Sequence, residues 1–375
     1  MTVLTVAPAD SAFRISPFAP EPPFALDMSR KRILLYSAAG VLLVATLVAG
    51  LAAWTFFGAN TPSFEGERTV TIPDRNFDAA VDSLQAAGLL RSESSIRLLA
   101  SATGIVSSTP WSEQIKPGHY AFSAGASSYD LLDTIRKGLQ APVRVTIPPG
   151  RQPDVVAAVM GRELKLPKKD FLNALQDTTL AESLGVDVDH LFGYMLPNTY
   201  EFYWQTPARD VVKRVKREFD RYFERELANA AADAGLTKHQ VLTLASIVEW
   251  EAYQDDEKPV IAGVYLNRLD DQWRLQADPT IQYVLIDTEG ERTRRVLYKH
   301  LEIDHPYNTY RNVGLPPGPI TNPAPSTLRA VVYPEQHEYY FFAADGTGGH
   351  QFSRTLREHN RAAANYHRLL DERRK

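Results

Sequence analysis

Two glutamates stand two residues apart in an otherwise apolar stretch, LASIVEWEAY, at residues 244–253. Carboxyl groups are common proton donors and acceptors in glycoside cleavage, where two of them usually lie about 5 Å or about 6.5–9.5 Å apart. Successive residues of a helix are rotated by about 100°, so Glu249 and Glu251 point to nearly opposite sides. The two acids therefore cannot both reach one substrate bond from the same helix.

The helical neighbours of the two acids favour Glu249, but only weakly. Glu249 shares a face with the small residues Ala245 and Ser246, which would leave room for a ligand, whereas Glu251 lies over Ile247 on an apolar side. Apolar surroundings favour the protonated carboxyl that a general acid needs near neutral pH. The residues alone leave open that both acids are buried and paired for stability.

Signatures of other chemistry are absent from the sequence. It contains no GxxxxGK[ST], GxGxxG, HExxH or GxSxG motif, which excludes the common phosphate, dinucleotide, zinc-protease and serine-hydrolase signatures. His300 and His305 are five residues apart, not the one-turn spacing of a helical metal site, and the chain has no cysteine. We expect neither a metal nor another cofactor. The formal net charge of −4 gives no support for nucleic-acid binding.

The helix that would carry the glutamates has a clear start. Thr237 is a good N-cap, and Gln240 three residues later fits a capping box. A further helix is predicted at residues 259–269, beginning with a proline in its first turn. Beyond about residue 275 we expect short segments with many turns, followed by a charged helix at 354–375.

The region before this helix divides into two parts. Residues 69–140 predict a small α/β unit of strand, helices, strand and helix. The segment PVRVTIPPG at residues 142–150 is predicted to be a strand. The chain that follows is expected to be mostly helical, with a helix at 209–232. The aromatic segment LFGYMLPNTYEFYW at 191–204 interrupts these helices, and we expect a loop or short strand that lines a cleft or fills the core.

Residues 33–57 form an uncharged apolar run, which is long enough for a bilayer span of about 20 residues. A basic triplet, Arg30 to Arg32, precedes the run, so the positive-inside rule places residues 1–32 in the cytoplasm as a tail. We expect a polar linker at 58–68 and an outer part that follows it. The predicted location is the plasma (inner) membrane, with a single span and a periplasmic or other extracytoplasmic catalytic part.

Six segments in fixed order resemble the endolytic murein transglycosylases, the MltG or YceG-like family. They are LASIVEWE (244–251), AGVYLNRL (262–269), LQADPTIQY (275–283), HPYNTY (305–310), GLPPGPITNP (314–323) and ADGTGGHQFS (344–353). The resemblance covers about residues 66–365. It implies an α+β fold behind one transmembrane helix, with a LysM-like subdomain at 69–140 and a mixed α/β, YceG-like catalytic domain at 141–375.

The resemblance also implies an activity. It indicates a lyase that cuts nascent peptidoglycan strands internally, between N-acetylmuramic acid and N-acetylglucosamine, without water. The products would carry 1,6-anhydromuramyl ends, and the cut would terminate glycan elongation. The family's catalytic glutamate falls on Glu249. The expected partners are peptidoglycan glycan strands, the membrane and peptidoglycan synthases of the elongation machinery, with no nucleic acid and no cofactor.

Other site residues follow from the matched motifs. Groove residues are expected at Asn267, Gln276, Asp278, Tyr307, Asn308 and Tyr310. Tyr200 and Tyr283 are candidate sugar platforms, with a core role as an equal alternative. Trp250 replaces a usual basic residue and could stack on a sugar, and Glu251 is expected to be a structural neighbour that supports Glu249.

Three positions depart from the family pattern. Pro149, Phe192 and Asn198 stand where the family usually has acids. These departures support an alternative, a membrane-anchored peptidoglycan-binding scaffold with a degenerate site. A hydrolase is a third possibility; an inverting one would need a second carboxylate about 6.5–9.5 Å from the first, and Asp278 is the candidate.

Overall fold

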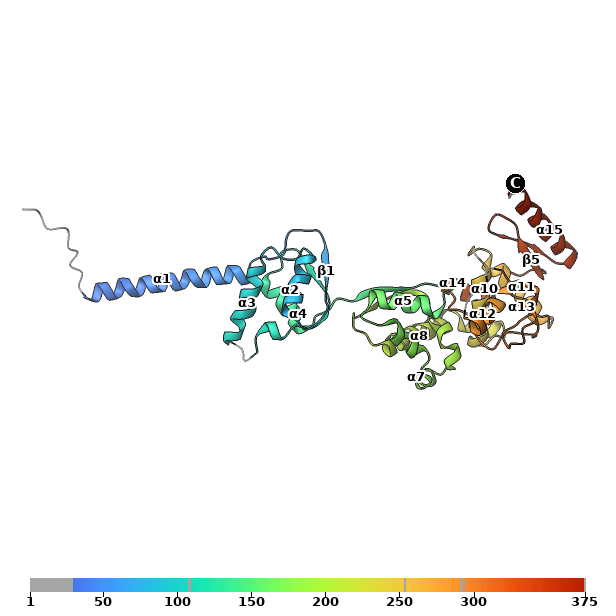
Figure 1. Ribbon diagram of the computed structural model, residues 1–375, viewed down its shortest axis with the longest axis horizontal. Coiled ribbons are helices and arrows are strands. Elements are labelled where there is room, and N and C mark those ends of the chain that lie inside the picture. The colour runs from blue at the N-terminus through green and yellow to red at the C-terminus, as the bar shows by residue number, and fades with distance from the viewer. Residues whose placement is uncertain (1–29, 107–108, 253, 291–292, 294, 374–375) are drawn as a thin grey trace, which may run out of the picture.

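The computed structural model describes residues 30–106, 109–252, 254–290, 293 and 295–373. The predicted cytoplasmic tail at 1–32 therefore lies almost entirely outside the described residues. Within them the chain is a mixed α/β protein with many helices and three two-stranded antiparallel sheets. It is elongated, with an isolated N-terminal helix followed by a small unit and a larger one (Figure 1).

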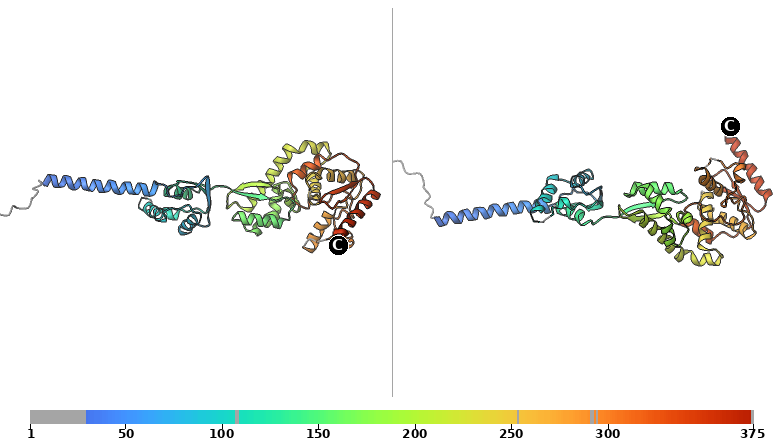
Figure 2. Two further views of the ribbon diagram at one scale, coloured as in Figure 1. Left: turned by 90° about the horizontal axis from the view of Figure 1, so that it is seen from above. Right: turned by 60° about the horizontal axis from the view of Figure 1, so that its bottom comes forward.

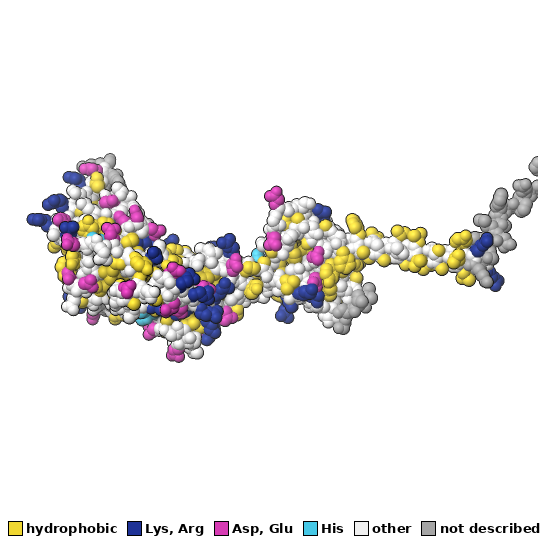
Figure 3. Space-filling view, turned by 180° about the vertical axis from the view of Figure 1, so that it is seen from behind, with side chains coloured by type: hydrophobic (Ala, Val, Ile, Leu, Met, Phe, Trp, Pro, Cys, Tyr) yellow, Lys and Arg dark blue, Asp and Glu magenta, His cyan; other side chains and the backbone are white. Residues whose placement is uncertain are grey.

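Helix α1, Arg30–Phe57, extends away from the rest of the chain. Most of its described side chains are exposed and apolar (Figure 3), while its last turns pack against the small unit through Phe56 and Phe57. The part from Arg32 to Phe57 has a mean hydropathy of 2.2, and its most apolar window has no buried residue. Among the described residues it is the one helix long and apolar enough to cross a membrane.

The chain enters the small unit directly after α1. The backbone N–H groups of Asn60 and Thr61 both donate to the carbonyl of Ala126, at 2.8 and 2.9 Å. The Asn60 side chain donates to the Ser92 carbonyl and to the Ser128 hydroxyl, and Asn60 and Thr61 are both buried. The start of the segment predicted as a polar linker, 58–68, is thus packed into the small unit, because its polar groups find partners there.

The small unit has a core of its own. Strand β1, Glu67–Ile72, pairs antiparallel with β2, Gly118–Ser123. Buried residues such as Leu84, Tyr120 and Ile135 fill the space between this sheet and its helices. The helices are α2 (Phe77–Ala86), α3 (Glu93–Val106), the 3₁₀ helix η1 (Trp111–Glu113) and α4 (Ser128–Lys137).

The larger unit has two lobes, seen as the green and the orange parts of Figure 1 and from two further sides in Figure 2. The N-lobe contains β3 (Val143–Ile147), α5 (Pro153–Glu163), α6 (Lys168–Leu175), α7 (Thr178–Ser183), η2 (Val188–Tyr194), β4 (Asn198–Phe202), α8 (Ala208–Glu226) and α9 (Ala228–Asp233). The C-lobe contains α10 (Lys238–Glu251), α11 (Lys258–Asp270), α12 (Asp278–Glu289), α13 (Tyr298–Leu301), α14 (Pro325–Val332), β5 (Phe341–Ala344) and β6 (His350–Ser353). Helix α15, Leu356–Arg373, packs against β5 and β6 at the far end.

Three differences from the predicted elements stand out. The aromatic segment 191–204 is divided between η2 and β4, and β4 pairs antiparallel with β3, so that Tyr200 faces Val145. The predicted helix at 209–232 is interrupted at Leu227. Helix α12 lies where only short, turn-rich segments were expected; its proline is in the first turn, where a missing N–H costs nothing.

One hydrophobic core runs through both lobes, and α10 crosses it. All residues from Val241 to Val248 are buried. The predicted capping box is present at its start: the Thr237 hydroxyl accepts from the Gln240 N–H, and the Gln240 side chain accepts from the Thr237 N–H at 2.9 Å. A helix buried on all sides is held in place by tertiary packing.

We expect Thr237→Ala to lower the free energy of unfolding by about 1 kcal/mol, because it removes the N-cap acceptor of α10. Thr237→Ser keeps the hydroxyl and should unfold like the wild type. Thermal unfolding of the detergent-solubilised chain measures the difference. Equal losses in the Ala and Ser variants would show that the hydroxyl is not what matters.

Candidate active site

Helix α10 brings both glutamates to its last turn, where it leaves the core. The small residues on the Glu249 face do not open to a ligand. Ala245 and Ser246 are fully buried, and the Ser246 hydroxyl accepts a hydrogen bond from the Ile320 N–H at 2.9 Å. The expectation that they leave room for a substrate is therefore wrong: the space is filled by the chain around Ile320.

The Glu249 carboxylate is held by three groups from other segments. Its Oε2 accepts hydrogen bonds from the Ala324 N–H, at 3.1 Å, and from the Thr327 hydroxyl. The Lys258 ammonium lies 3.5 Å from the same oxygen. All of the hydrogen bonds found among the described residues fall on Oε2. The carboxylate is thus fixed through Oε2, and Oε1 accepts no hydrogen bond from the described residues.

The surroundings of this carboxylate are dry and positive. The side chain of Glu249 is 9% exposed and that of Lys258 is 7% exposed. Ala324 caps the N-terminus of α14, where unpaired N–H groups and the helix dipole favour a negative charge. Lys258 also pairs with the exposed Asp255 at 2.7 Å. Any negative charge that develops on Glu249 is stabilised by preorganised groups.

The loop around Gly150 covers the other side of Glu249. Gly150 has φ +62°, and a Cβ there would lie 3.3 Å from the Glu249 Cγ. The Gly150 carbonyl accepts the indole N–H of Trp250 at 2.9 Å. Position 150 therefore requires glycine for both its backbone conformation and its close approach. Trp250, expected as a sugar platform, uses its N–H to hold this loop.

Asn322 fastens the same loop from the C-lobe. Its side-chain N–H₂ donates to the carbonyls of Pro148 and Met195, at 3.0 and 3.1 Å. Its side-chain oxygen accepts from the Arg151 N–H, and its carbonyl accepts from the Gly150 N–H at 2.9 Å. Asn322 is fully buried. The proline-rich segment 314–323 thus acts through its asparagine as a clamp on the loop.

Glu251 lies in a different polar cluster. Burial first, and then the charge of Asp278, raise the pKa of Glu251 to about 8, while Arg268 acts in the opposite direction. The Tyr310 hydroxyl donates to Asp278 at 2.7 Å, and burial raises the pKa of Tyr310, so its donor proton stays in place. Arg268 donates to the carbonyls of Tyr340 and Leu275. The two glutamates thus have separate partners, as their helical spacing predicts.

The other predicted site residues are mostly held by the protein itself. Asn267 donates to the carbonyls of His337 and Tyr339, and Asn308, fully buried, donates to those of Leu301 and Ile303. Gln276 adopts φ +48° and donates its backbone N–H to the Thr309 carbonyl.

The predicted sugar platforms differ in exposure. Tyr200 is buried, and its hydroxyl donates to the Leu196 carbonyl at 2.6 Å, so it packs in the core. Tyr283 and Tyr307 are in contact, with ring centroids 4.5 Å apart and ring planes tilted by 33°. Tyr283 also lines a groove between the lobes.

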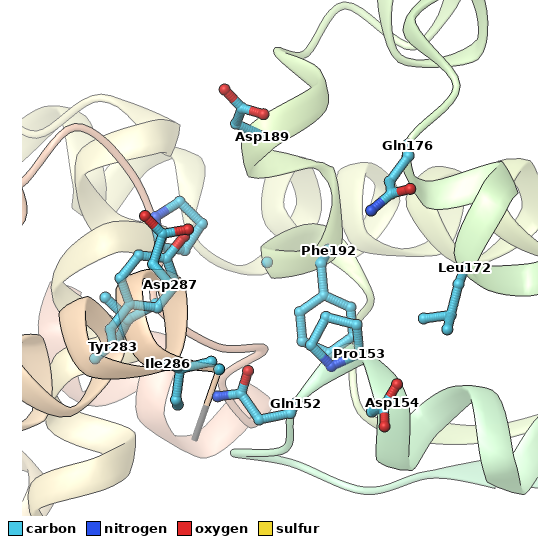
Figure 4. Close-up of a pocket in the computed structure, with 14 residues that line it drawn as sticks. Gln152, Pro153, Asp154, Leu172, Gln176, Asp189, Phe192, Tyr283, Ile286 and Asp287 are labelled. Atoms are coloured by element: carbon cyan, nitrogen blue, oxygen red, sulfur yellow. The ribbon is translucent and has the colours of Figure 1, made fainter. Parts of the chain in front are cut away.

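This groove has a volume of about 670 Å³. Figure 4 shows Phe192, Gln152 and Gln176 of the N-lobe on one side and Tyr283 and Asp287 of α12 on the other. The Glu249 side chain is not among the residues that line it. The expectation that Glu249 opens into a roomy groove is therefore not met among the grooves of the described residues. The loop at 150–153 runs from Glu249 to the wall of this groove.

Three residues of the site were missed by reasoning from the sequence. Asn322 lies in a matched segment but was not singled out, and Thr327 follows that segment. Lys258 had a local signal, because a cation in the first turn of a helix is unfavourable with the helix dipole and so suggests a partner elsewhere.

Comparison with known proteins agrees with this architecture. The model of the YceG-like family matches residues 70–365. The chain belongs to the YceG-like family. A crystal structure described as a yceG-like protein from Listeria monocytogenes superimposes with a TM-score of 0.56 at 29% identity, covering 80% of this chain and 99% of that one.

Curated relatives of this YceG-like chain carry one name. A Bacillus subtilis (strain 168) protein named endolytic murein transglycosylase is 33% identical over 265 residues, which are 66% of this chain and 72% of the relative. A Streptococcus pneumoniae (strain D39) protein of the same name is 28% identical over 284 residues, 67% of this chain. The match spans 51% of the length of that relative.

Glu251 should make stability depend on pH. The folded YceG-like chain holds this proton up to about pH 8, whereas an unfolded chain releases it near 4.5. Stability should therefore fall as the pH rises between these values, by at most about 1.4 kcal/mol per pH unit. Glu251→Gln should remove this dependence and unfold at a higher temperature than the wild type at pH 8. Glu289→Gln, at an exposed glutamate, is the control. If the free energy of unfolding depended on pH in the same way in the wild type and both variants, the raised pKa of Glu251 would be contradicted.

Gly150→Ala tests the close approach to Glu249. A left-handed backbone costs a non-glycine residue about 1–2 kcal/mol, and the added Cβ must also displace Glu249. Gly185→Ala is a matched control, since Gly185 has φ +68° and no neighbour within 4 Å. We expect Gly150→Ala to lower the free energy of unfolding more than Gly185→Ala does. Equal losses of unfolding free energy in the two variants would mean that the Gly150 loop can move away from Glu249 without cost.

Proposed function

We propose that this protein is a lyase, a lytic transglycosylase that cuts peptidoglycan glycan strands between N-acetylmuramic acid and N-acetylglucosamine. The observation that supports this best is the single fixed carboxylate of Glu249, with one oxygen held by the Ala324 N–H and the Thr327 hydroxyl and flanked by Lys258. Membership of the YceG-like family and the name of the curated relatives support the same activity.

In the proposed first step Glu249 is a general acid. Its Oε1 gives a proton to the glycosidic oxygen, the bond from that oxygen to C1 of the muramic acid breaks, and the N-acetylglucosamine leaves with a free hydroxyl. The muramic acid becomes an oxocarbenium-like species. The charge that appears on Glu249 is balanced by Lys258 and by the N-terminus of α14.

In the second step the same carboxylate is the general base. It takes the proton from the C6 hydroxyl of the muramic acid while that oxygen bonds to C1, which closes the 1,6-anhydro ring. Glu249 regains its proton, and no water is consumed. The reaction needs one carboxyl group, which agrees with a site where only one of the two glutamates is held by Lys258 and α14.

A hydrolase is a less well supported alternative. An inverting enzyme would need a second carboxylate to position water. Glu251 has a pKa raised to about 8 by burial, so it is neutral near pH 7 and a poor base for water. Asp278, the other candidate, is hydrogen-bonded by Tyr310. A peptidoglycan-binding scaffold is the remaining alternative, and the intact surroundings of Glu249 argue against it.

We further propose that α1 spans the plasma membrane once, with residues 1–32 in the cytoplasm and the catalytic part outside. The length and apolar surface of α1 support this, as does the basic triplet before it. The small unit at 69–140 would be the LysM-like subdomain of the family. The cut would act on nascent strands and terminate their elongation beside peptidoglycan synthases.

Glu249→Gln should lower the rate of glycan cleavage by roughly 10²-fold or more, since it removes the acid and base of both steps. The assay digests purified glycan strands with the full chain and identifies the new ends by mass spectrometry. Wild-type protein should give 1,6-anhydro ends, and Glu251→Gln should still give them.

Other products would decide between the alternatives. Reducing ends would indicate the hydrolase, and no products at all would indicate the scaffold. If Glu249→Gln kept wild-type activity while Glu251→Gln lost it, the role assigned to Glu249 would belong to Glu251.

A further inference from the structure

The groove between the lobes is built from both sides. Its floor is a tight contact, since a Cβ at Gly193 would lie 2.2 Å from the Pro319 ring. Phe192 stands beside this floor on the N-lobe, and Tyr283 and Asp287 face it from α12 (Figure 4). Two smaller hollows share lining residues with it, one beyond Gln176 and one beyond Asp287. The groove is thus one part of a larger depression, which continues over the N-lobe past Gln176 and between the lobes past Asp287.

The lining combines aromatic faces with hydrogen-bonding groups. Phe192 and Tyr283 are half-buried rings, and Gln176 and Asp189 are exposed polar residues beside them. Burial first, and then the charge of Asp287, raise the pKa of Tyr283, so its hydroxyl remains a donor at neutral pH. A few polar groups around aromatic surface are typical of small-molecule and saccharide sites.

Gln152 is the second observation that points to a ligand. Its side-chain nitrogen, Nε2, is buried and has no hydrogen-bond acceptor among the described residues. A buried donor without an acceptor costs about 1–3 kcal/mol. In Figure 4 the amide of Gln152 points from the N-lobe toward α12. Gln152 lines the groove, so a rotation of its side chain would let a carbonyl oxygen of a ligand there supply the missing acceptor.

The groove begins close to the proposed catalytic residue. Gly150 packs against Glu249, and Gln152 and Pro153 already line the groove. Two residues of chain span at most about 7 Å. A strand of sugars bound at Glu249 would therefore reach the groove without leaving the protein surface.

We propose that this groove binds the N-acetylated sugar backbone of the glycan strand next to the cleaved bond, with Phe192 as the stacking platform and Gln152 as the donor to an N-acetyl carbonyl. The inference rests on the proposed function for the identity of the strand. Phe192 is a half-buried ring whose side chain lines the groove. A pyranose ring offers C–H groups to an aromatic face and hydroxyls to the amides and carboxylates beside it.

The charge of the lining disfavours acidic stem peptides. None of the described residues that line the groove is lysine or arginine. Three of them are aspartates: Asp154, Asp189 and Asp287. Asp154 is paired with Lys168 and Asp287 with His305, but Asp189 has no ion-pair partner among the described residues. Carboxylates repel the carboxylates of a peptide, whereas the N-acetylglucosamine units of the strand are neutral and meet no such barrier.

The test uses full-length protein in detergent and glycan strands from which the stem peptides have been removed. Binding is measured by calorimetry in a Glu249→Gln background, which prevents cleavage. Phe192→Leu keeps apolar volume but lacks a ring, and it should weaken binding by about 2- to 10-fold. Phe192→Glu should weaken it at least as much, and Phe192→Tyr should bind like the parent.

Gln152→Leu separates binding from structure. It removes a buried amide nitrogen that has no acceptor in the protein, so the unfolding temperature should rise or stay the same while strand binding weakens. Tyr203→Leu is the matched control, because Tyr203 is an exposed aromatic residue of the same lobe that lies outside the groove. It should change neither property.

Three results would overturn the proposal. They are unchanged binding in both Phe192→Leu and Gln152→Leu, Phe192-dependent binding of free stem peptide in place of the strand, and no binding by the parent at strand concentrations that saturate wild-type cleavage. Failure of the proposed function looks different. The wild type would then produce no anhydro ends, while binding could still depend on Phe192. If the wild type produced anhydro ends while Phe192→Leu and Gln152→Leu bound the strand normally, the proposed binding groove would be refuted and the proposed activity would stand.

Discussion

The hydrogen bonds of Asn322 are the constraint on which the site depends. One buried side chain joins the carbonyls of Pro148 and Met195 and the N–H of Arg151, which are 174, 127 and 171 residues away in sequence. These bonds hold the Gly150 loop against Glu249. They also fix the start of α14, whose first N–H groups and Thr327 hold the carboxylate. A buried amide with all its partners present specifies one arrangement of these segments.

The two glutamates show how the surroundings give similar side chains different chemistry. Glu249 meets an ammonium, a hydroxyl and a helix N-terminus, which together accept a negative charge. Glu251 ends the same helix beside Asp278, and burial keeps its proton on. The first environment suits a group whose charge changes during a reaction. The second environment suits a carboxyl group that stays neutral.

The sequence predicted the parts of this arrangement that are local. The capping box of α10, the opposite directions of Glu249 and Glu251, and the order of strands and helices in the small unit follow from short-range rules. Helix α12 was missed because its residues lack a clear period, and tertiary contacts decide its conformation. The roles of Lys258, Thr327 and Asn322 could not be predicted, since each depends on which distant segment it meets. Ala245 and Ser246 suggested a cavity, but residue size alone does not say what fills the space.

The hydrogen bonds of Asn322 also have a consequence for synthesis, because the chain is made from its N-terminus. The groups that complete the surroundings of Glu249 come late in the sequence, at residues 322–327, long after α10 and the Gly150 loop. A chain that is still being synthesised or exported has the glutamate without its support. The proposed glycan-cutting site therefore does not exist until nearly the whole protein has folded, and any fragment that ends before α14 would be inert.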